Sequence, residues 1–110
     1  HYNLDNLVLI LDRNGLQISG NTEDVMALRD IHLKYEAFGF NVIETDGHNY
    51  EDLMAAFTLA RHTKEKPTLI VANTVKGKGI SFMENVAAWH HGVLNEEQYM
   101  QAMKELEEQA

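Results

Sequence analysis

The stretch that decides the fold is Thr68-Leu69-Ile70-Val71-Ala72-Asn73-Thr74-Val75. It is a continuous apolar run rich in β-branched side chains, which is typical of a parallel strand covered on both faces. Parallel strands are joined by crossover connections that usually contain a helix. The segments before this run should therefore alternate between helices and strands.

They do alternate. Shorter strands are expected at residues 6–11 and 40–45, and the pattern predicts a helix between them that Thr22 caps and Gly39 ends. A second helix, Tyr50–His62, is expected after the cap residue Asn49. This order predicts an α/β fold, a three-layer parallel sheet with helices on both faces. The apolar positions of the first helix are spaced by three or four residues: Val25, Leu28, Ile31, Tyr35 and Phe38.

A long loop is expected after the decisive strand, over residues 76–94. Loops of this length are uncommon in a compact domain and are either functional or disordered. The loop should end where Asn95 and Gln98 have the spacing of a capping box, which predicts a last helix.

Composition limits the classes of function. The 110 residues carry seventeen acidic and nine basic side chains, for a net charge of -8, which argues against nucleic-acid binding. No apolar run is long enough to cross a membrane, and the start lacks a signal-peptide pattern, so we expect a cytoplasmic protein. There are no cysteines, which excludes disulfides and thiolate chemistry. The chain lacks an initiating Met and reaches a strand within a few residues, so we expect a piece of a longer protein.

Three polar or glycine-rich turns follow the three predicted strands, at residues 12–20, 46–49 and 76–79. Ligands of open α/β sheets bind outside the carboxyl ends of the strands, so these turns are expected to converge on one ligand. In the first turn, the amide oxygen of Asn14 can serve a metal or a diphosphate. The alternative is that Asn14 and Gly15 merely form a turn.

The other two chemical candidates lie in the long loop. Lys76-Gly77-Lys78-Gly79 would suit an anion such as a phosphate, although a mobile basic turn is an equal alternative. In Trp89-His90-His91-Gly92 one histidine can donate to a diphosphate oxygen or transfer protons, because adjacent side chains of an extended chain face opposite ways. The alternative is a surface histidine pair whose indole neighbour anchors the loop. In the second turn, His48 can also reach the ligand.

The residues and their order closely resemble the transketolase family, and in particular the N-terminal section that forms a separate subunit in split transketolases. The similarity covers essentially the whole chain. It rests on Leu4-Asp5-Asn6-Leu7-Val8, Asp12-Arg13-Asn14-Gly15-Leu16-Gln17-Ile18-Ser19-Gly20, Tyr35-Glu36-Ala37-Phe38-Gly39-Phe40, Asp46-Gly47-His48 and Thr74-Val75-Lys76-Gly77-Lys78-Gly79-Ile80-Ser81-Phe82-Met83-Glu84-Asn85.

This resemblance implies a cofactor, thiamine diphosphate, bound with Mg²⁺. It implies that Asn14 is a side-chain ligand of Mg²⁺, that the carbonyl of Leu16 is another, and that Ile18 packs on the thiazolium ring. Hard oxygen donors of this kind suit Mg²⁺. The resemblance also implies that the cofactor is lined by Gly15, Lys76, Gly77 and a loop histidine.

The catalytic histidine is either His90 or His91. Alignment without a gap from Asn85 to Asn95 matches His90 to the family's Trp-His-Gly motif, whereas matching the glycine selects His91. We favour His90.

The resemblance further implies that residues 1–110 are the C-terminal half of the diphosphate-binding domain. The family's acidic metal ligand lies upstream of this region, and the glutamate that activates the cofactor lies in a pyrimidine-binding domain or a C-terminal subunit. We therefore expect a homo- or hetero-oligomeric parent that transfers a two-carbon ketol unit between sugar phosphates, as in the pentose phosphate pathway, and a piece that is inactive alone. The alternatives are a piece of 1-deoxyxylulose-5-phosphate synthase and a non-catalytic association module.

Overall fold

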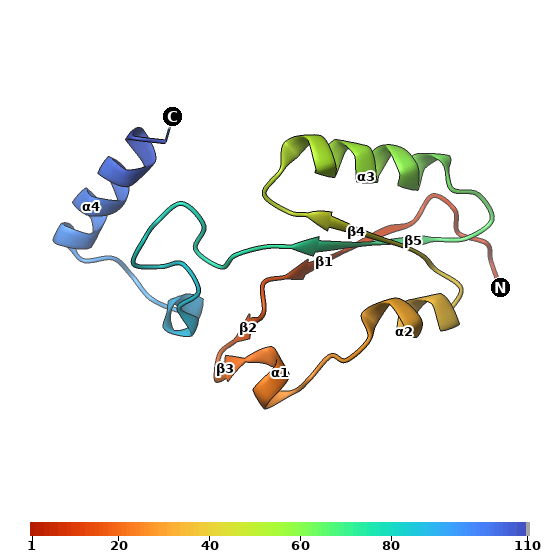
Figure 1. Cartoon of the computed structure of the whole chain (residues 1–110), viewed down its shortest axis with the longest axis horizontal. Helices are drawn as coiled ribbons and strands as arrows, with labels where there is room; N and C mark the ends of the chain where they lie inside the picture. Colours follow the sequence, from red (N-terminus) through yellow and green to blue (C-terminus); the bar gives the residue numbers. More distant parts are fainter. Residues whose placement is uncertain (110) are drawn as a thin grey trace. The chain divides into compact units, whose positions relative to one another are not determined.

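The centre of the fold is β5, Thr68–Asn73, which lies between β1, Val8–Arg13, and β4, Asn41–Asp46, in a three-stranded parallel sheet. The order β1-β5-β4 can be followed in Figure 1. Leu69, Ile70 and Val71 are fully buried, which confirms the prediction of a parallel strand covered on both faces. The strand ends at Asn73, two residues before the predicted end.

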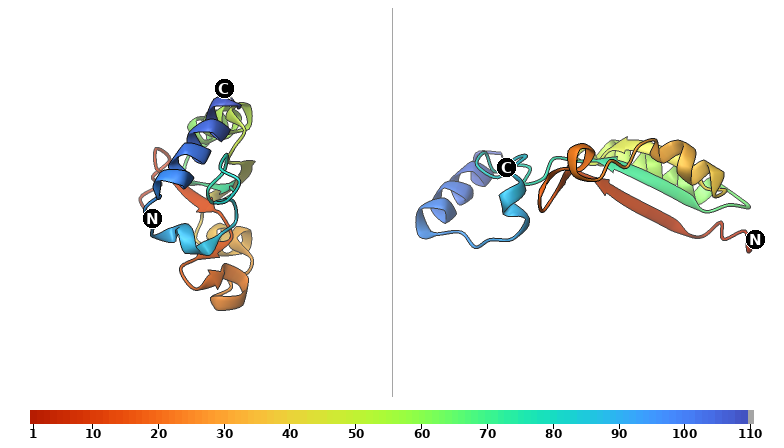
Figure 2. Two further views of the ribbon diagram at one scale, coloured as in Figure 1. Left: turned by 90° about the vertical axis from the view of Figure 1, so that its left-hand side faces the viewer. Right: turned by 90° about the horizontal axis from the view of Figure 1, so that it is seen from below.

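Two helices cover the two faces of this sheet. Ile31 of α2, Ile31–Ala37, packs with Leu69 and Val71 on one face, whereas Ala56 and Ala60 of α3, Tyr50–His62, pack with Ile70 on the other. Alternate side chains of a strand point to opposite faces, so one strand supplies both cores. The further views of Figure 2 show the two helices on opposite sides of the strands, which confirms the three-layer α/β fold.

The single helix predicted before residue 39 is two helices. The first is α1, Thr22–Val25, and the chain is non-helical until α2 begins after Asp30. The Asp30 side chain accepts a hydrogen bond from the Leu33 amide, so this residue starts a new helix, and Arg29 has a positive φ of 59°. The apolar spacing alone did not reveal this competing cap.

Thr22 is not a cap either. The N-cap residue of α1 is Asn21, and the Thr22 hydroxyl donates instead to the Gly15 carbonyl at 3.2 Å.

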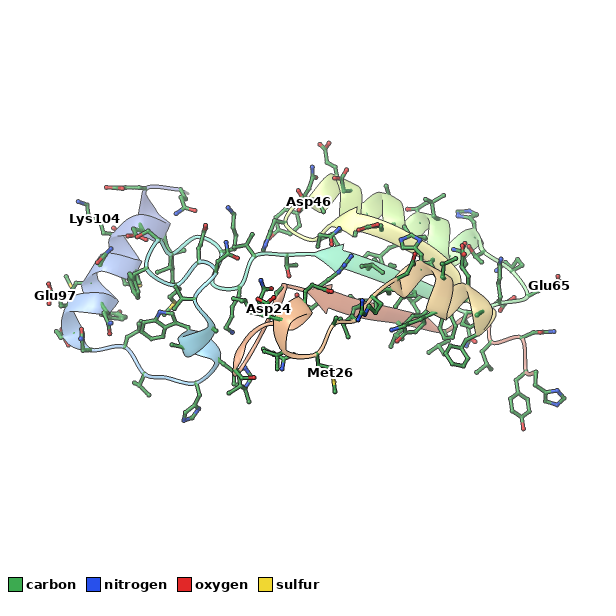
Figure 3. All side chains as sticks on the ribbon, turned by 60° about the horizontal axis from the view of Figure 1, so that its bottom comes forward. Asp24, Met26, Asp46, Glu65, Glu97 and Lys104 are labelled. Carbon is green, nitrogen blue, oxygen red and sulfur yellow. The ribbon has the colours of Figure 1, made fainter. Side chains whose placement is uncertain are left out.

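Met26, at the C-terminal end of α1, has a side chain that extends away from the ribbon (Figure 3) and is 75% exposed.

The predicted stop at Gly39 is confirmed. Gly39 has a φ of +85°, its amide donates to the Glu36 carbonyl, and the Phe40 amide donates to the Tyr35 carbonyl. These two bonds form a Schellman motif. The rings of Tyr35 and Phe40 meet edge to face at 5.3 Å, which closes the turn with an apolar contact.

The remaining helices begin where their caps predict. Helix α3, Tyr50–His62, starts after Asn49, whose side chain accepts hydrogen bonds from the Glu51 and Asp52 amides. Helix α4, Glu96–Glu107, starts with a complete capping box between Asn95 and Gln98. In both cases the signal is local, so tertiary packing does not override it.

The computed structural model describes residues 1–109, which form two compact units. The sheet unit comprises His1–Arg13 and Leu28–Thr74, and the loop unit comprises Asn14–Ala27 and, of the described residues, 75–109. The loop unit contains α1, α4, the two-residue strands β2, Leu16–Gln17, and β3, Gly20–Asn21, and the short 3-10 helix η1, Ala87–His90.

Within the described part of the chain, no helix is both long and apolar enough to cross a membrane.

Candidate functional site

A pocket of about 350 Å³ in the loop unit brings together residues far apart in the sequence. Two segments build it: the turn after β1 and the loop after β5. Its lining residues are Asn14, Leu16, Gln17, Ile18, Lys76 and His90. Five of these six residues were predicted at a ligand site from the sequence; Gln17 was not.

The turn after β1 holds Asn14 by its own side chain. Its Oδ1 atom accepts a hydrogen bond from the Leu16 amide at 3.0 Å, and Gly15 between them has a φ of +73°. This is an Asx turn, so the simple turn-forming role of Asn-Gly is present. A carbonyl oxygen has two lone pairs, so the bond fixes the amide while leaving it able to accept a second donor or to ligate a cation.

A two-stranded hairpin continues the turn. β2 pairs with β3 in antiparallel register, Leu16 with Asn21 and Gln17 with Gly20. Ile18 lies at its tip and is 72% exposed, so this large apolar side chain is available to pack against a ligand. The position of Gln17 between Leu16 and Ile18 was the signal that could have identified it, but a two-residue strand has no sequence pattern of its own.

The loop after β5 contributes Lys76. The Lys76 carbonyl accepts a hydrogen bond from the Asn85 amide at 3.0 Å, which closes the turn between these residues. Gly77 lies beside it with a φ of +74°, and a Cβ placed there would come within 2.6 Å of Met83. The close packing against Met83 therefore explains why a glycine is needed at position 77. Lys76 lines the pocket, and Gly77 does not.

Of the two adjacent histidines, His90 lines the pocket and His91 does not. His90 ends η1, which lies against β2, whereas His91 has an extended backbone. Trp89 fixes this helix, because its indole Nε1 donates to the Phe82 carbonyl at 3.0 Å and its ring packs on that of Phe82 at 5.7 Å. The indole thus links two parts of the same loop, whereas the sequence alternative, that it anchors the loop to the core, stays a prediction.

The donor set of the pocket is neutral to cationic. Asn14 and backbone carbonyls offer oxygen atoms to a hard cation, while Lys76 and His90 can donate to an anion. No carboxylate lines the pocket, and residues 1–109 hold no cluster of three or more His, Asp or Glu side chains able to ligate a metal. These residues fit a diphosphate with its Mg²⁺, provided that a charged metal ligand comes from elsewhere.

The second predicted turn belongs to the sheet unit. Asp46, labelled in Figure 3 at the end of β4, accepts a hydrogen bond from the His48 amide at 2.8 Å. Gly47 is required there, because a Cβ would collide with the Thr74 side chain. The convergence of this turn with the other two stays a prediction.

One polar network lies on the face of the sheet that α2 covers. The Glu44 carboxylate accepts hydrogen bonds from Asn73 at 2.9 Å and from His32 at 3.2 Å, and Arg13 lies 3.9 Å away. The Asn73 hydrogen bond has the largest effect and lowers the pKa of Glu44. Burial opposes it, whereas the hydrogen bond and charge of His32 and the charge of Arg13 lower the pKa further. The four side chains link β1, β4, β5 and α2.

Residues 1–108 match the family described as "Transketolase, thiamine diphosphate binding domain". The chain belongs to the transketolase family. Its relatives within the family include an apulose-4-phosphate transketolase subunit of Phocaeicola vulgatus, 50% identical over 107 residues. That alignment covers 97% of this chain and 38% of the relative, so the chain spans well under half of its length.

Two other transketolases are also similar to this chain. The 6-deoxy-6-sulfo-D-fructose transketolase subunit SqwG of a Clostridium strain is 40% identical over 96% of this chain and 38% of its own. The crystal structure of transketolase from Campylobacter jejuni superposes with a TM-score of 0.88 at 32% identity, over 96% of this chain and 16% of that one. The prediction of a transketolase of the split-subunit type is therefore confirmed at the level of the family and its homologous subunits.

Proposed function

We propose that this chain forms part of the cofactor site of a split-type transketolase, in which it contributes one side of the Mg²⁺–diphosphate contact. The observation that carries the proposal is the pocket that joins Asn14 and Leu16 to Lys76 and His90 within the loop unit. The family that the chain belongs to is defined by thiamine diphosphate binding. Two relatives named as transketolase subunits match nearly all of the chain.

Five of the six lining residues, and two glycines beside them in the sequence, have a role in this proposal. The Asn14 amide oxygen and the Leu16 carbonyl ligate Mg²⁺, while Lys76 and His90 donate to the diphosphate oxygens. The exposed Ile18 packs against the thiazolium ring. Gly15 gives the turn its left-handed backbone, and Gly77 keeps Lys76 in place by its packing against Met83. The cofactor supplies the carbanion chemistry, and the protein supplies binding and orientation.

The reaction of the complete protein is proposed to be transfer of a two-carbon ketol unit between sugar phosphates. The chain also requires a partner that carries the pyrimidine-binding domain, either as a later domain or as a second subunit. The names of the two subunit relatives support a second subunit.

The 110 residues alone are proposed to be inactive and to bind the cofactor weakly. The pocket offers neutral oxygen donors to Mg²⁺ and no carboxylate to offset its charge. Isothermal titration of thiamine diphosphate into the chain, with and without Mg²⁺, measures this. Micromolar, Mg²⁺-dependent binding would overturn the expectation.

A coupled assay tests the reaction on the complete protein with its partner. Turnover of ribose 5-phosphate with xylulose 5-phosphate supports a transketolase, whereas turnover of pyruvate with glyceraldehyde 3-phosphate would identify a 1-deoxyxylulose-5-phosphate synthase instead. Activity with neither pair would contradict the proposal.

One observation favours a second function, that of an association module. β1 is an edge strand, and Leu9 and Ile10 are 40% and 53% exposed. Exposed apolar side chains on an unpaired edge promote self-association. If sedimentation shows oligomers of the chain and the complete protein binds no cofactor, this function replaces the first.

A further inference from the structure

Helix α4 holds the pocket loop through a cluster of hydrogen bonds centred on Glu105. The carboxylate of Glu105 accepts from the Ser81 amide at 2.6 Å and from the Ser81 hydroxyl at 2.6 Å. It also accepts from the Gln101 side chain, one turn earlier on the helix, at 2.7 Å. Three donors meet one carboxylate, and these hydrogen bonds lower the pKa of Glu105, which keeps it ionised and able to accept.

A second contact lies just beyond the C-terminal end of α4. The Gln109 side chain donates to the Gly79 carbonyl at 2.9 Å and to the carbonyl of Glu105, a residue of α4, at 3.0 Å. Helix α4 therefore holds the loop at Ser81, and Gln109, just after the helix, holds it at Gly79. Other charged side chains of α4 are placed differently: Lys104, labelled in Figure 3, pairs with Glu108 at 3.8 Å.

Further contacts within the loop connect Ser81 to the pocket residues. Phe82, directly after Ser81, accepts the indole hydrogen bond of Trp89 and packs against its ring, and Trp89 precedes His90. On the other side of the turn, Glu84 accepts from the Gly79 amide at 3.0 Å, and the Asn85 amide donates to the Lys76 carbonyl. Lys76 and His90, the two pocket residues proposed to bind an anion, are thus both supported by the segment that Ser81 anchors.

We infer that Ser81 and Glu105 form a positioning pair that holds His90 and Lys76 in place for anion binding. Neither residue lines the pocket itself. The inference rests on the proposed function for its consequence, because the anion is the diphosphate proposed above. Its structural part, the control of the loop by α4, holds whether or not the pocket takes that ligand.

The test uses Trp89, the only tryptophan of the 110 residues, as a reporter beside His90. The variants Ser81→Ala and Glu105→Gln should each raise acrylamide quenching of Trp89 and speed amide exchange of residues 76–90 about threefold or more, since loop hydrogen bonds are lost. Ser81→Thr keeps the hydroxyl and the amide, so it should restore wild-type values. Glu107→Gln is the matched control, because it removes the same charge from an exposed position of the same helix.

The double variant decides the pairing. If Ser81 and Glu105 act together, the double variant should exchange no faster than the worse single variant, whereas independent effects would multiply. Wild-type quenching and exchange in both single variants would overturn the inference, as would equal effects of Glu107→Gln.

The consequence for the ligand is measured on the complete protein. The same two variants should weaken thiamine diphosphate binding, and Glu107→Gln should not. Looser loops with unchanged affinity would overturn the positioning role. If the wild-type protein does not bind thiamine diphosphate, the proposed function is wrong instead. Failure of the positioning role and failure of the proposed function are therefore distinguishable.

Discussion

The side-chain oxygen of Asn14 accepts a hydrogen bond from the backbone amide of Leu16 at 3.0 Å. The turn thereby joins the two residues that are proposed to ligate Mg²⁺, one through its side chain and one through its carbonyl. The bond fixes the amide before any ligand binds, which reduces the ordering cost of binding. Turn formation and metal ligation are therefore compatible roles of the same oxygen.

Replacement of Asn14 should weaken cofactor binding in the complete protein. Asn14→Ala removes a metal ligand and the Asx turn, and we expect the Mg²⁺-dependent affinity for thiamine diphosphate to fall by about tenfold or more. Asn14→Asp retains oxygen acceptors at the same place and should bind Mg²⁺ better than the alanine variant. Titration calorimetry measures both, and equal affinities of wild type and Asn14→Ala would contradict the assignment.

The two loop histidines provide a matched pair. His90→Ala should lower the affinity for thiamine diphosphate by about threefold to tenfold through loss of one donor to a charged group, whereas His91→Ala should leave it unchanged, since only His90 lines the pocket. The same titration compares them. A larger effect at His91 would assign the role to the other histidine.

The core of the sheet unit should depend on Ile70 far more than on Ile10. Ile70 is fully buried against Ala56 and Ala60, so Ile70→Ala should lower the free energy of unfolding by about 2 to 5 kcal/mol. Ile10 is 53% exposed on the edge strand, and Ile10→Ala should cost less than about 1 kcal/mol. Urea denaturation followed by circular dichroism tests this, and similar losses would contradict the position of the core.

Two glycines with similar backbones should respond differently to alanine. Gly15 and Gly77 have φ of +73° and +74°, so each substitution is strained, but only at Gly77 would the new Cβ collide, with Met83 at 2.6 Å. We expect Gly77→Ala to speed amide exchange of residues 76–85 strongly. Gly15→Ala should cost only the strain of a left-handed residue, about 1 to 2 kcal/mol. Unchanged exchange in Gly77→Ala would show that the turn is not packed as described.

Stability should decrease at acidic pH partly through Glu44. Its pKa is lowered in the folded state by the Asn73 hydrogen bond and by His32, so its contribution is fully present above the pKa of the unfolded chain. The contribution is lost as pH falls through the lower folded pKa. Glu44→Gln should flatten the acid limb of the stability curve, measured by urea denaturation across that range. An acid limb identical to wild type would contradict this.

The features that the sequence predicted are those with local causes. Asn49 and the pair Asn95 and Gln98 begin their helices as expected, because a cap needs only its own first turn. The apolar run at Leu69, Ile70 and Val71 was equally clear. The predicted helix before Gly39 was wrong because Asp30 starts a second helix within the same apolar spacing.

The residues of the candidate site also divide into those that the sequence predicted and those that it did not. Asn14 was predicted because its turn follows a strand, whereas Leu16 and Ile18 were predicted from the resemblance of this stretch to a known family. Gln17 was missed, and the choice between His90 and His91 stayed open. Both depend on short elements, a two-residue hairpin strand and the 3-10 helix η1, which form through contacts between distant segments and leave little periodicity in the sequence.

The most direct measurement is a crystal structure of the complete protein with thiamine diphosphate and Mn²⁺ in place of Mg²⁺, located by anomalous scattering. We expect a metal at roughly 2.1 Å from both Asn14 Oδ1 and the Leu16 carbonyl oxygen, with Lys76 and His90 donating to the diphosphate. A metal and diphosphate bound without Asn14 and Leu16 would contradict it.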